Sequence, residues 1–211
     1  MSGIFGMNIK MAIYGESHGK SIGVVLDGLP PGLALDEAAI AAEMARRAPG
    51  QNALSTARKE SDTVEIQSGF FNGFTTGTPL CARIVNSDQH SKDYSILADK
   101  MRPGHADYAG HVRYQGFNDY RGGGHFSGRL TAPLVFAGAV AKQALAQYGI
   151  VVGSHILQIN DIQEERFNPM GVSDAVLAEL HAKKFAVMDD AVGEKMQERI
   201  LQAKSELNSV G

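Results

Sequence analysis

The five residues Gly15-Glu16-Ser17-His18-Gly19 place a hydroxyl and an imidazole side by side between two glycines. They match the G-x-S-x-G pattern of a serine-hydrolase nucleophile elbow, in which a helix follows the serine. They also suit a loop that binds a phosphorylated ligand, because glycines allow close approach, Ser17 donates a hydrogen bond and His18 can donate a proton. The next residues, Lys-Ser-Ile-Gly-Val-Val-Leu-Asp, favour a strand. The sequence therefore favours the ligand-binding loop over the hydrolase, with a turn histidine that has no catalytic task as the plain alternative.

A second cluster lies between residues 101 and 129, where seven glycines occur among histidines, tyrosines and arginines. Glycines let backbone amides approach a ligand, aromatic rings can stack on a flat ring, and arginines bind carboxylates and phosphates through two hydrogen bonds. Its Gly122-Gly123-Gly124 run lacks the spacing of a Walker or Rossmann motif. The cluster favours a site for an anion and a planar ring, with a surface loop as the alternative.

Charge is distributed unevenly along the chain. Residues 46–129 hold 11 lysines and arginines against 8 acidic residues, a net of +3, whereas residues 161–211 hold 6 against 10, a net of −4. The basic middle suits a small anion, and the acidic end suits a solvated face. Arg46, Arg47 and Arg58 belong to the basic part, although cations at the end of a helix would explain the first two. The histidines lack the carboxylate or cysteine spacing of a metal site, so we expect no metal.

The composition is that of an ordinary globular protein. The net charge of −3 and the pI of about 6.2 argue against a nucleic-acid or anionic-membrane binder. A single cysteine rules out an internal disulfide and suits a reducing compartment. The N-terminus does not read as a signal peptide, and the longest apolar run is about half of a membrane span. We therefore expect a soluble, cytoplasmic protein that binds neither nucleic acid nor membrane.

Hydrophobic patterning predicts strands and helices that alternate without a regular βαβ rhythm. The expected strands are residues 8–14, 21–27, 63–71, 79–85 and 150–159, with Asn72-Gly73 as a hairpin turn. The expected helices are residues 37–47 after an Asp36 cap, 130–148, 173–184 and 191–207, the last with Val192, Met196, Ile200 and Leu207 on one face. Residues 86–128 are expected to be irregular. The pattern favours an α+β or layered β-α-β fold over a doubly wound sheet.

Eight short motifs occur in the order typical of one enzyme family. They are Gly15–Gly19, Asp27–Gly32, Arg46–Gln51, Thr56–Asp62, Ser68–Phe71, Thr75–Pro79, Arg102–Tyr108 and Tyr120–Gly124. Through them the chain closely resembles the chorismate synthases, from about residue 8 to residue 150 and more loosely beyond.

The resemblance implies a carbon–oxygen lyase of the shikimate pathway, which serves aromatic amino acid biosynthesis. This family removes phosphate and a ring hydrogen from 5-enolpyruvylshikimate 3-phosphate by anti-1,4-elimination, giving chorismate. It uses reduced FMN (FMNH2), which is not consumed overall, with NADPH as a candidate reductant. It usually forms a homotetramer of β-α-β sandwich subunits, in which helices pack between mixed sheets.

The resemblance also implies roles for individual residues. His18 matches the histidine that protonates the departing phosphate, and His105 matches the one that manages the protonation state of reduced flavin. The residues implied to hold substrate anions are Ser17, Arg46, Arg58 and Arg129. The residues implied to bind cofactor are Arg47, for a nicotinamide nucleotide, and His125, Phe126 and Ser127, for FMN.

Three features depart from the family pattern. After the glycines the family commonly reads Arg-Ser-Ser-Ala-Arg-Glu-Thr, whereas this chain reads His125-Phe-Ser-Gly-Arg-Leu-Thr131. Ala53 stands where many members carry a second arginine of the nucleotide site. Family members are also longer, so we expect residues 1–211 to be a single domain that lacks its C-terminal part. The alternative function is a catalytically incomplete fragment that only binds ligand or partner chains.

Overall fold

The computed structural model describes residues 4–48, 61–87 and 96–211. They form two compact units, one ending at Ala144 and the other starting at Leu145. One domain over residues 1–211 stays a prediction, because two compact units can belong to one domain.

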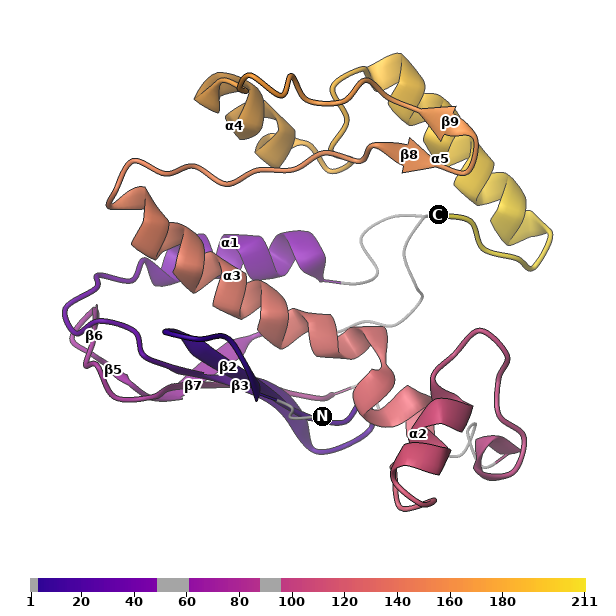
Figure 1. Ribbon diagram of the computed structural model, residues 1–211, viewed down its shortest axis with the longest axis horizontal. Helices are drawn as coiled ribbons and strands as arrows, with labels where there is room; N and C mark the ends of the chain where they lie inside the picture. The colour runs from indigo at the N-terminus through magenta and orange to yellow at the C-terminus, as the bar shows by residue number, and fades with distance from the viewer. Residues whose placement is uncertain (1–3, 49–60, 88–95) are drawn as a thin grey trace. The chain divides into compact units, whose positions relative to one another are not determined.

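The first unit is built on a five-stranded sheet in the order β1-β2-β3-β7-β4, with every neighbouring pair antiparallel. Its strands are β1 (Ile4–Phe5), β2 (Lys10–Gly15), β3 (Ser21–Asp27), β4 (Val64–Ser68) and β7 (Leu80–Val85). All neighbouring strands of this sheet are antiparallel, and its strands and helices follow one another in no regular alternation, which confirms the predicted α+β class (Figure 1).

Alternating apolar residues of β3 and β7 form the centre of the core. Ile22 pairs with Ile84, Val24 with Ala82, and Leu26 with Leu80, and all six side chains are buried. Residues directly opposite each other in an antiparallel pair lie on the same face of the sheet. One face of the sheet is therefore a continuous apolar surface, and it fixes the strand register.

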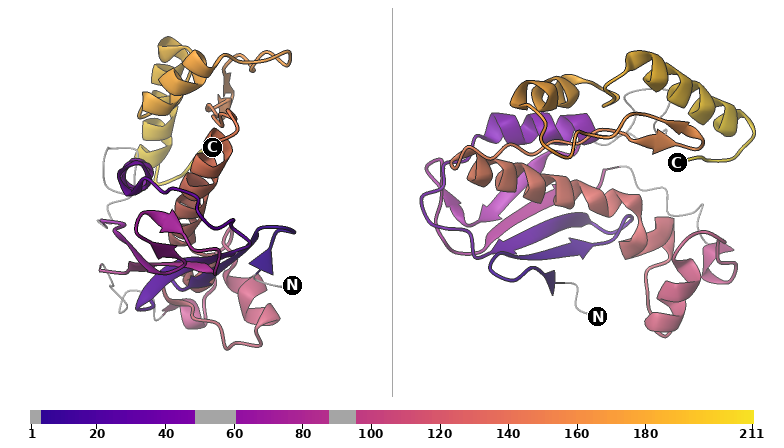
Figure 2. Two further views of the ribbon diagram at one scale, coloured as in Figure 1. Left: turned by 90° about the vertical axis from the view of Figure 1, so that its left-hand side faces the viewer. Right: turned by 45° about the horizontal axis from the view of Figure 1, so that its top comes forward.

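Two helices, α1 (Glu37–Arg47) and α3 (Thr131–Ala146), cover this apolar face (Figures 1 and 2). Asp36 caps α1 as predicted, because its Oδ1 accepts hydrogen bonds from the amides of Ala38 and Ala39. Gln143 of α3 accepts from the amide of Asp36 and donates to its carbonyl. The cap thus fixes the start of α1 to α3 as well as ending the preceding loop.

The predicted Asn72-Gly73 hairpin is also present, between β5 (Phe70–Phe71) and β6 (Phe74–Thr75). Both turn residues have positive φ, 50° and 86°, as a two-residue type I′ turn requires. The region 86–128 was expected to be irregular, but it contains helix α2 (Asp107–Arg113) and the 3-10 turns η2 (Arg121–Phe126) and η3 (Gly128–Leu130). Sequence patterning missed α2 because it is a short helix with an internal glycine and no side-chain cap.

The second unit contains a small hairpin, β8 (Gln158–Ile159) with β9 (Ile162–Gln163), and helices α4 (Asp174–Ala182) and α5 (Asp190–Ser205). The strand predicted for residues 150–159 is wrong except for its last two residues. Ile150, Val151 and Val152 are apolar and β-branched, yet they are exposed and belong to no strand.

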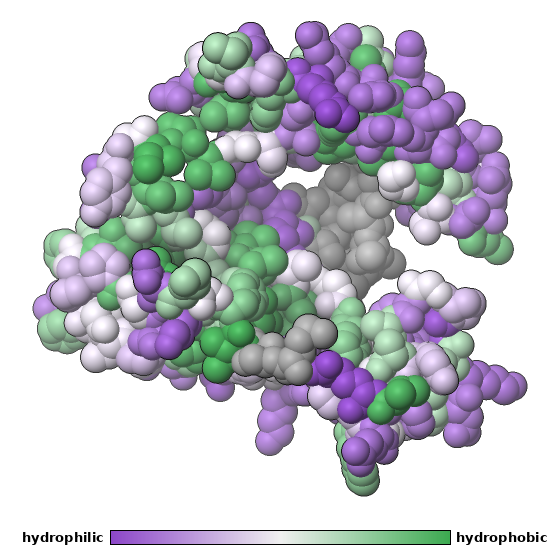
Figure 3. Space-filling view, viewed as in Figure 1, coloured by the Kyte–Doolittle hydropathy of each residue, from purple (hydrophilic) through white to green (hydrophobic). Residues whose placement is uncertain are grey.

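The predicted apolar face of the last helix is only partly correct. Met196 is fully buried, whereas Leu207 is exposed and lies beyond the end of α5. Hydrophilic residues dominate the visible surface of α5 (Figure 3), consistent with a solvated acidic end. In the described residues, every helix is too short or too polar to cross a bilayer.

Candidate active site

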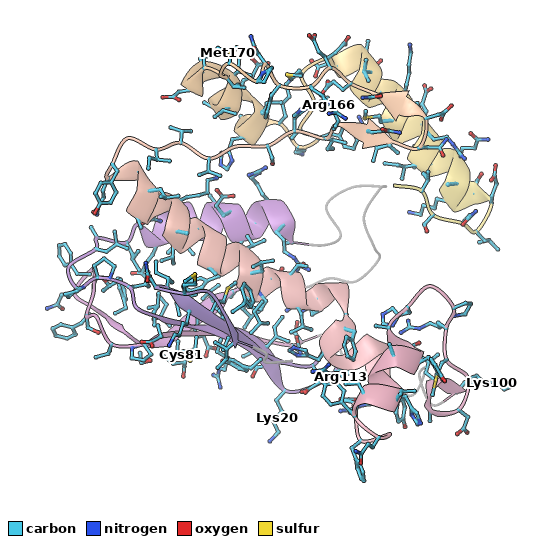
Figure 4. The ribbon with its side chains drawn as sticks, viewed as in Figure 1. Lys20, Cys81, Lys100, Arg113, Arg166 and Met170 are labelled. Carbon is cyan, nitrogen blue, oxygen red and sulfur yellow. The ribbon has the colours of Figure 1, made fainter. Side chains whose placement is uncertain are left out.

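The Gly15–Gly19 loop joins β2 to β3 at one end of the sheet. Because a strand follows the loop, where a nucleophile elbow needs a helix, the hydrolase alternative is excluded. Ser17 and His18 are buried, with His18 only 5% exposed, whereas Lys20 extends away from the ribbon (Figure 4). The loop therefore turns its hydroxyl and imidazole inward and its cation outward.

The triglycine run Gly122–Gly124 packs directly against this loop. All three residues have positive φ, and the carbonyl of Gly124 accepts a hydrogen bond of 3.0 Å from the amide of Ser17. A Cβ on Gly122 would overlap Nδ1 and Cε1 of His18. The glycines thus provide a wall without side chains, against which His18 lies.

His105 lies against the next residue of the same wall. A Cβ on Gly123 would be 2.6 Å from Cε1 and 2.8 Å from Nε2 of His105. The structure therefore brings the two histidines, 87 positions apart in the chain, to neighbouring glycines of one turn.

Asp107 holds His105 from the other side of its ring. Its Oδ1 lies 2.6 Å from Nδ1 of His105, although the two groups are not aligned as a good hydrogen bond. Its two oxygens also accept hydrogen bonds of 2.8 and 3.0 Å from Nε and Nη2 of Arg102. The hydrogen bonds from Arg102 hold the pKa of Asp107 well below its usual range. The carboxylate thus lies at Nδ1 of His105, whereas Cε1 and Nε2 of the same ring lie against Gly123.

A second carboxylate–arginine pair lies beside His18. Asp119 accepts hydrogen bonds of 2.9 and 2.6 Å from Nε and Nη2 of Arg121. These bonds lower the pKa of Asp119, and the charge of His18 lowers it slightly further. Asp119 is therefore ionised and places a negative charge near His18.

Arg129, predicted to hold substrate, is 4% exposed and bound within the protein. Its Nη1 forms an ion pair with Oδ1 of Asp62, and its Nε donates to Oδ1 of Asn86. Asp62 Oδ2 in turn lies 2.6 Å from Nη1 of Arg47, and Nη2 of Arg47 donates to Gly128 O and Thr131 Oγ1. Asp62 thus neutralises part of the charge that Arg47 and Arg129 would offer to a ligand.

The three predicted FMN contacts lie next to the triglycine run. Nδ1 of His125 is 2.8 Å from the carbonyl of Gly15, and because a carbonyl can only accept, Nδ1 carries the proton. Phe126 is partly exposed and packs against Gly110 of α2. Ser127 caps η3 by accepting from the amide of Arg129. His125 and Phe126 thus keep surface for a ligand, whereas the Ser127 hydroxyl has a structural task.

Two predicted site residues remain, Arg46 and Arg58. Arg46 is half-exposed on α1 and pairs with Glu43 one turn away at 3.1 Å. Arg58 lies outside the described residues. The structure thus gathers Ser17, His18 and His105 around the triglycine run, and it binds Arg47 and Arg129 to Asp62.

Sequence reasoning missed several polar residues around the site. Asp62 and Asp107 stand at the ends of motifs that carried the resemblance, so the sequence contained a signal for them. Asn86 had none, because a single asparagine after a strand is an ordinary turn residue.

Comparisons with known proteins identify the family of this chain. The family model described as "Chorismate synthase" matches residues 9–211. Over 207 residues the chain is 46% identical to the chorismate synthase of Aliarcobacter butzleri, covering 98% of this chain and 55% of that protein. Over 208 residues it is 42% identical to the chorismate synthase of Methanosarcina acetivorans, covering 99% and 56%.

A solved structure, described as "Crystal Structure of Chorismate Synthase", is similar with a TM-score of 0.69 and 25% sequence identity, covering 97% of this chain and 56% of that one. The chain spans about half the length of the relatives it matches. Sequence and fold together show that this chain belongs to the chorismate synthase family.

Proposed function

We propose that this chain carries the catalytic histidines of a chorismate synthase, a lyase that converts 5-enolpyruvylshikimate 3-phosphate to chorismate. The supporting observation is that one triglycine turn places His18 and His105 against adjacent residues, Gly122 and Gly123. In the proposed reaction a C–O bond to phosphate and a ring C–H bond break, and a second ring double bond forms. The reaction has no net oxidation, so no electron acceptor is consumed.

His18 is the proposed proton donor to the departing phosphate. A protonated phosphate leaves more readily, and His18, which is buried near the ionised Asp119, is placed to deliver that proton. Ser17 is the proposed hydrogen-bond donor that orients the same group. Arg46, Arg58 and Arg129 are the proposed anion-binding residues, with Arg129 acting from within its ion pair with Asp62.

The residues around the triglycine run fit reduced FMN. His105 is 27% exposed at its side chain, and His125 and Phe126 are also exposed, so an imidazole and an aromatic ring are available to a flat ligand. When bound, reduced FMN supplies an electron-rich ring that acts as electron source or base and is regenerated. His105 Nε2 would hold or release a proton beside it, whereas His125, Phe126 and Ser127 would hold the cofactor. NADPH is the proposed reductant, with Arg47 as its proposed contact.

The proposed assembly is a homotetramer in the cytoplasm, by analogy with the family. The second candidate function is binding of a ligand or partner chains without catalysis.

Phosphate release with reduced FMN and 5-enolpyruvylshikimate 3-phosphate tests the proposal. We expect release from the wild type and its loss from the double variant His18→Ala and His105→Ala, with flavin titration in parallel. Unchanged release in the double variant would refute the assigned roles. FMN binding without any release would instead support the binding-only function.

A further inference from the structure

Asn86 connects the Gly15–Gly19 loop to the buried charges at the other side of the site. It directly follows β7, is buried, and uses its whole side-chain amide. Nδ2 donates to the carbonyls of Glu16 at 3.1 Å and Gly19 at 2.8 Å, and Oδ1 accepts from Nε of Arg129 at 3.2 Å. The backbone amide of Asn86 also donates to the carbonyl of Lys20 at 3.2 Å. One residue therefore contacts both ends of the loop and Arg129.

Arg129, at one end of this connection, is itself held firmly in place. It pairs with Asp62, whose side chain is 0% exposed, and it lies in η3, two residues before the start of α3, whose first turn is packed in the core. Asp62 is held in turn by Arg47 at the end of α1. A hydrogen-bonded ion pair with little access to water resists displacement, because separating it would leave buried charges without partners.

The opposite side of the loop rests on the triglycine run. The amide of Ser17 donates to Gly124, and His18 packs on Gly122. The carbonyls that Asn86 binds, those of Glu16 and Gly19, flank Ser17 and His18 in the chain. A shift of the Asn86 amide would therefore move the two functional side chains relative to the glycine wall.

We propose that Asn86 is a positioning residue. Through its hydrogen bonds it holds the loop that carries Ser17 and His18 in a fixed position relative to the Arg129–Asp62 ion pair. The existence of this connection is independent of the reaction, and only its catalytic consequence rests on the proposed function. A 1 Å misplacement of a catalytic group can lower a rate by about 100-fold, so such a residue can matter without touching substrate.

Two substitutions distinguish the hydrogen bonds that Asn86 donates to the loop from the one that it accepts from Arg129. Asn86→Ala removes every side-chain hydrogen bond. Asn86→Asp keeps an acceptor for Arg129 but loses both donors and faces a carboxylate toward two carbonyl oxygens. Gln67→Ala is the matched control, since Gln67 is an exposed amide on β4 that donates a hydrogen bond to the carbonyl of Glu65 on the same strand.

Hydrogen–deuterium exchange of the 211-residue chain is the first measurement. We expect amides of residues 16–20 to exchange about tenfold faster in both Asn86 variants, with β3 and β7 unchanged and Gln67→Ala like the wild type. Exchange that rises equally across the whole sheet would show a merely structural role. Wild-type protection of the loop in Asn86→Asp would show that only the Arg129 contact matters. Either result overturns the proposal.

The second measurement reports on the functional side chain. We expect the NMR titration midpoint of His18 to move in both variants while that of His155 does not. In the phosphate-release assay we expect kcat to fall by about tenfold or more with KM changed less than about twofold. An unmoved His18 titration overturns the proposal. A wild type that releases no phosphate refutes the proposed reaction, whereas the exchange and titration results still decide the role of Asn86.

Discussion

Asp62 and Asp107 each bind arginine side chains near the candidate site, but they do so over different distances in the chain. Asp62 joins Arg47 and Arg129, which lie 15 and 67 residues away, and its side chain is completely buried. Asp107 joins Arg102 and His105, five and two residues away, at the edge of solvent.

The difference indicates that Asp62 stabilises the fold, whereas Asp107 positions a single side chain, that of His105. The Asp62 contacts exist only once α1, the residues just before β4 and the turn η3 have come together, so their loss should destabilise the whole first unit. The Asp107 contacts lie within a short segment that begins α2, so their loss should remain local to His105. Four substitutions test this contrast, from the largest expected effect to the smallest.

Asp62→Asn should produce the largest loss of stability. Asparagine tolerates the left-handed backbone of this position, where φ is 50°, so the change removes charge with little added strain. Removing one partner of a buried ion pair typically costs about 3–5 kcal/mol. Urea denaturation should show this loss, with the exposed Asp27→Asn as control. A loss no larger than the control's would remove the distinction between the two carboxylates.

Gly122→Ala should come next, because it adds a side chain to the wall on the His18 side. A left-handed alanine and an overlap with His18 together should cost about 2–3 kcal/mol. The proposed phosphate release should fall about 100-fold, since His18 must move. Gly128→Ala is the control, because a Cβ there meets nothing within 4 Å. Equal effects of the two variants would contradict the packing role of Gly122.

Asp107→Asn should destabilise the protein by about 1–2 kcal/mol near neutral pH, the loss of charge-assisted hydrogen bonds from Arg102. Because folding lowers the pKa of Asp107, its contribution is present above the ordinary value of 3.8 and is lost as pH falls below it. Unfolding free energies of wild type and variant should therefore converge in acid. A difference that stays constant with pH would show that the charge of Asp107 is not the cause.

Glu65→Gln should have the smallest effect. Oε2 of Glu65 on β4 lies 2.5 Å from Nη2 of Arg83 on β7, but the two side chains are 45% and 44% exposed. Exposed pairs contribute about 0–1 kcal/mol, and salt screens them further. Thermal unfolding at low and high salt should show little change. A loss as large as that of Asp107→Asn would mean that burial does not set the order of these effects.

Much of the first unit was predictable because its signals are local. The alternation in Ser21–Asp27, the Asp36 cap and the Asn72-Gly73 turn each specify their own structure within a few residues. The same reasoning failed at residues 150–157, where β-branched residues suggested a strand. A strand needs a partner with which to pair, and the described residues provide one only for Gln158 and Ile159.

In the site, too, only the residues marked by local motifs could be predicted. His18 and His105 were identified from motifs, and Asp107 lies within one of those motifs. The connection from Asp62 through Arg129 to Asn86 could not be predicted, because each step joins segments that are distant in the chain and no local pattern marks it. The sequence also suggested Arg47 and Arg129 as ligand contacts, without the carboxylate that occupies both.

The triglycine wall has a consequence for how this protein can change. Every substitution at Gly122 or Gly123 adds at least one carbon, and that carbon reaches one histidine or the other before it reaches anything else. In a library that samples all single replacements, these positions should therefore tolerate almost none, while Gly128, six positions beyond Gly122, accepts small residues. Both histidines would then be sensitive to mutation of the same short glycine run, although those glycines contribute no side chain to the site.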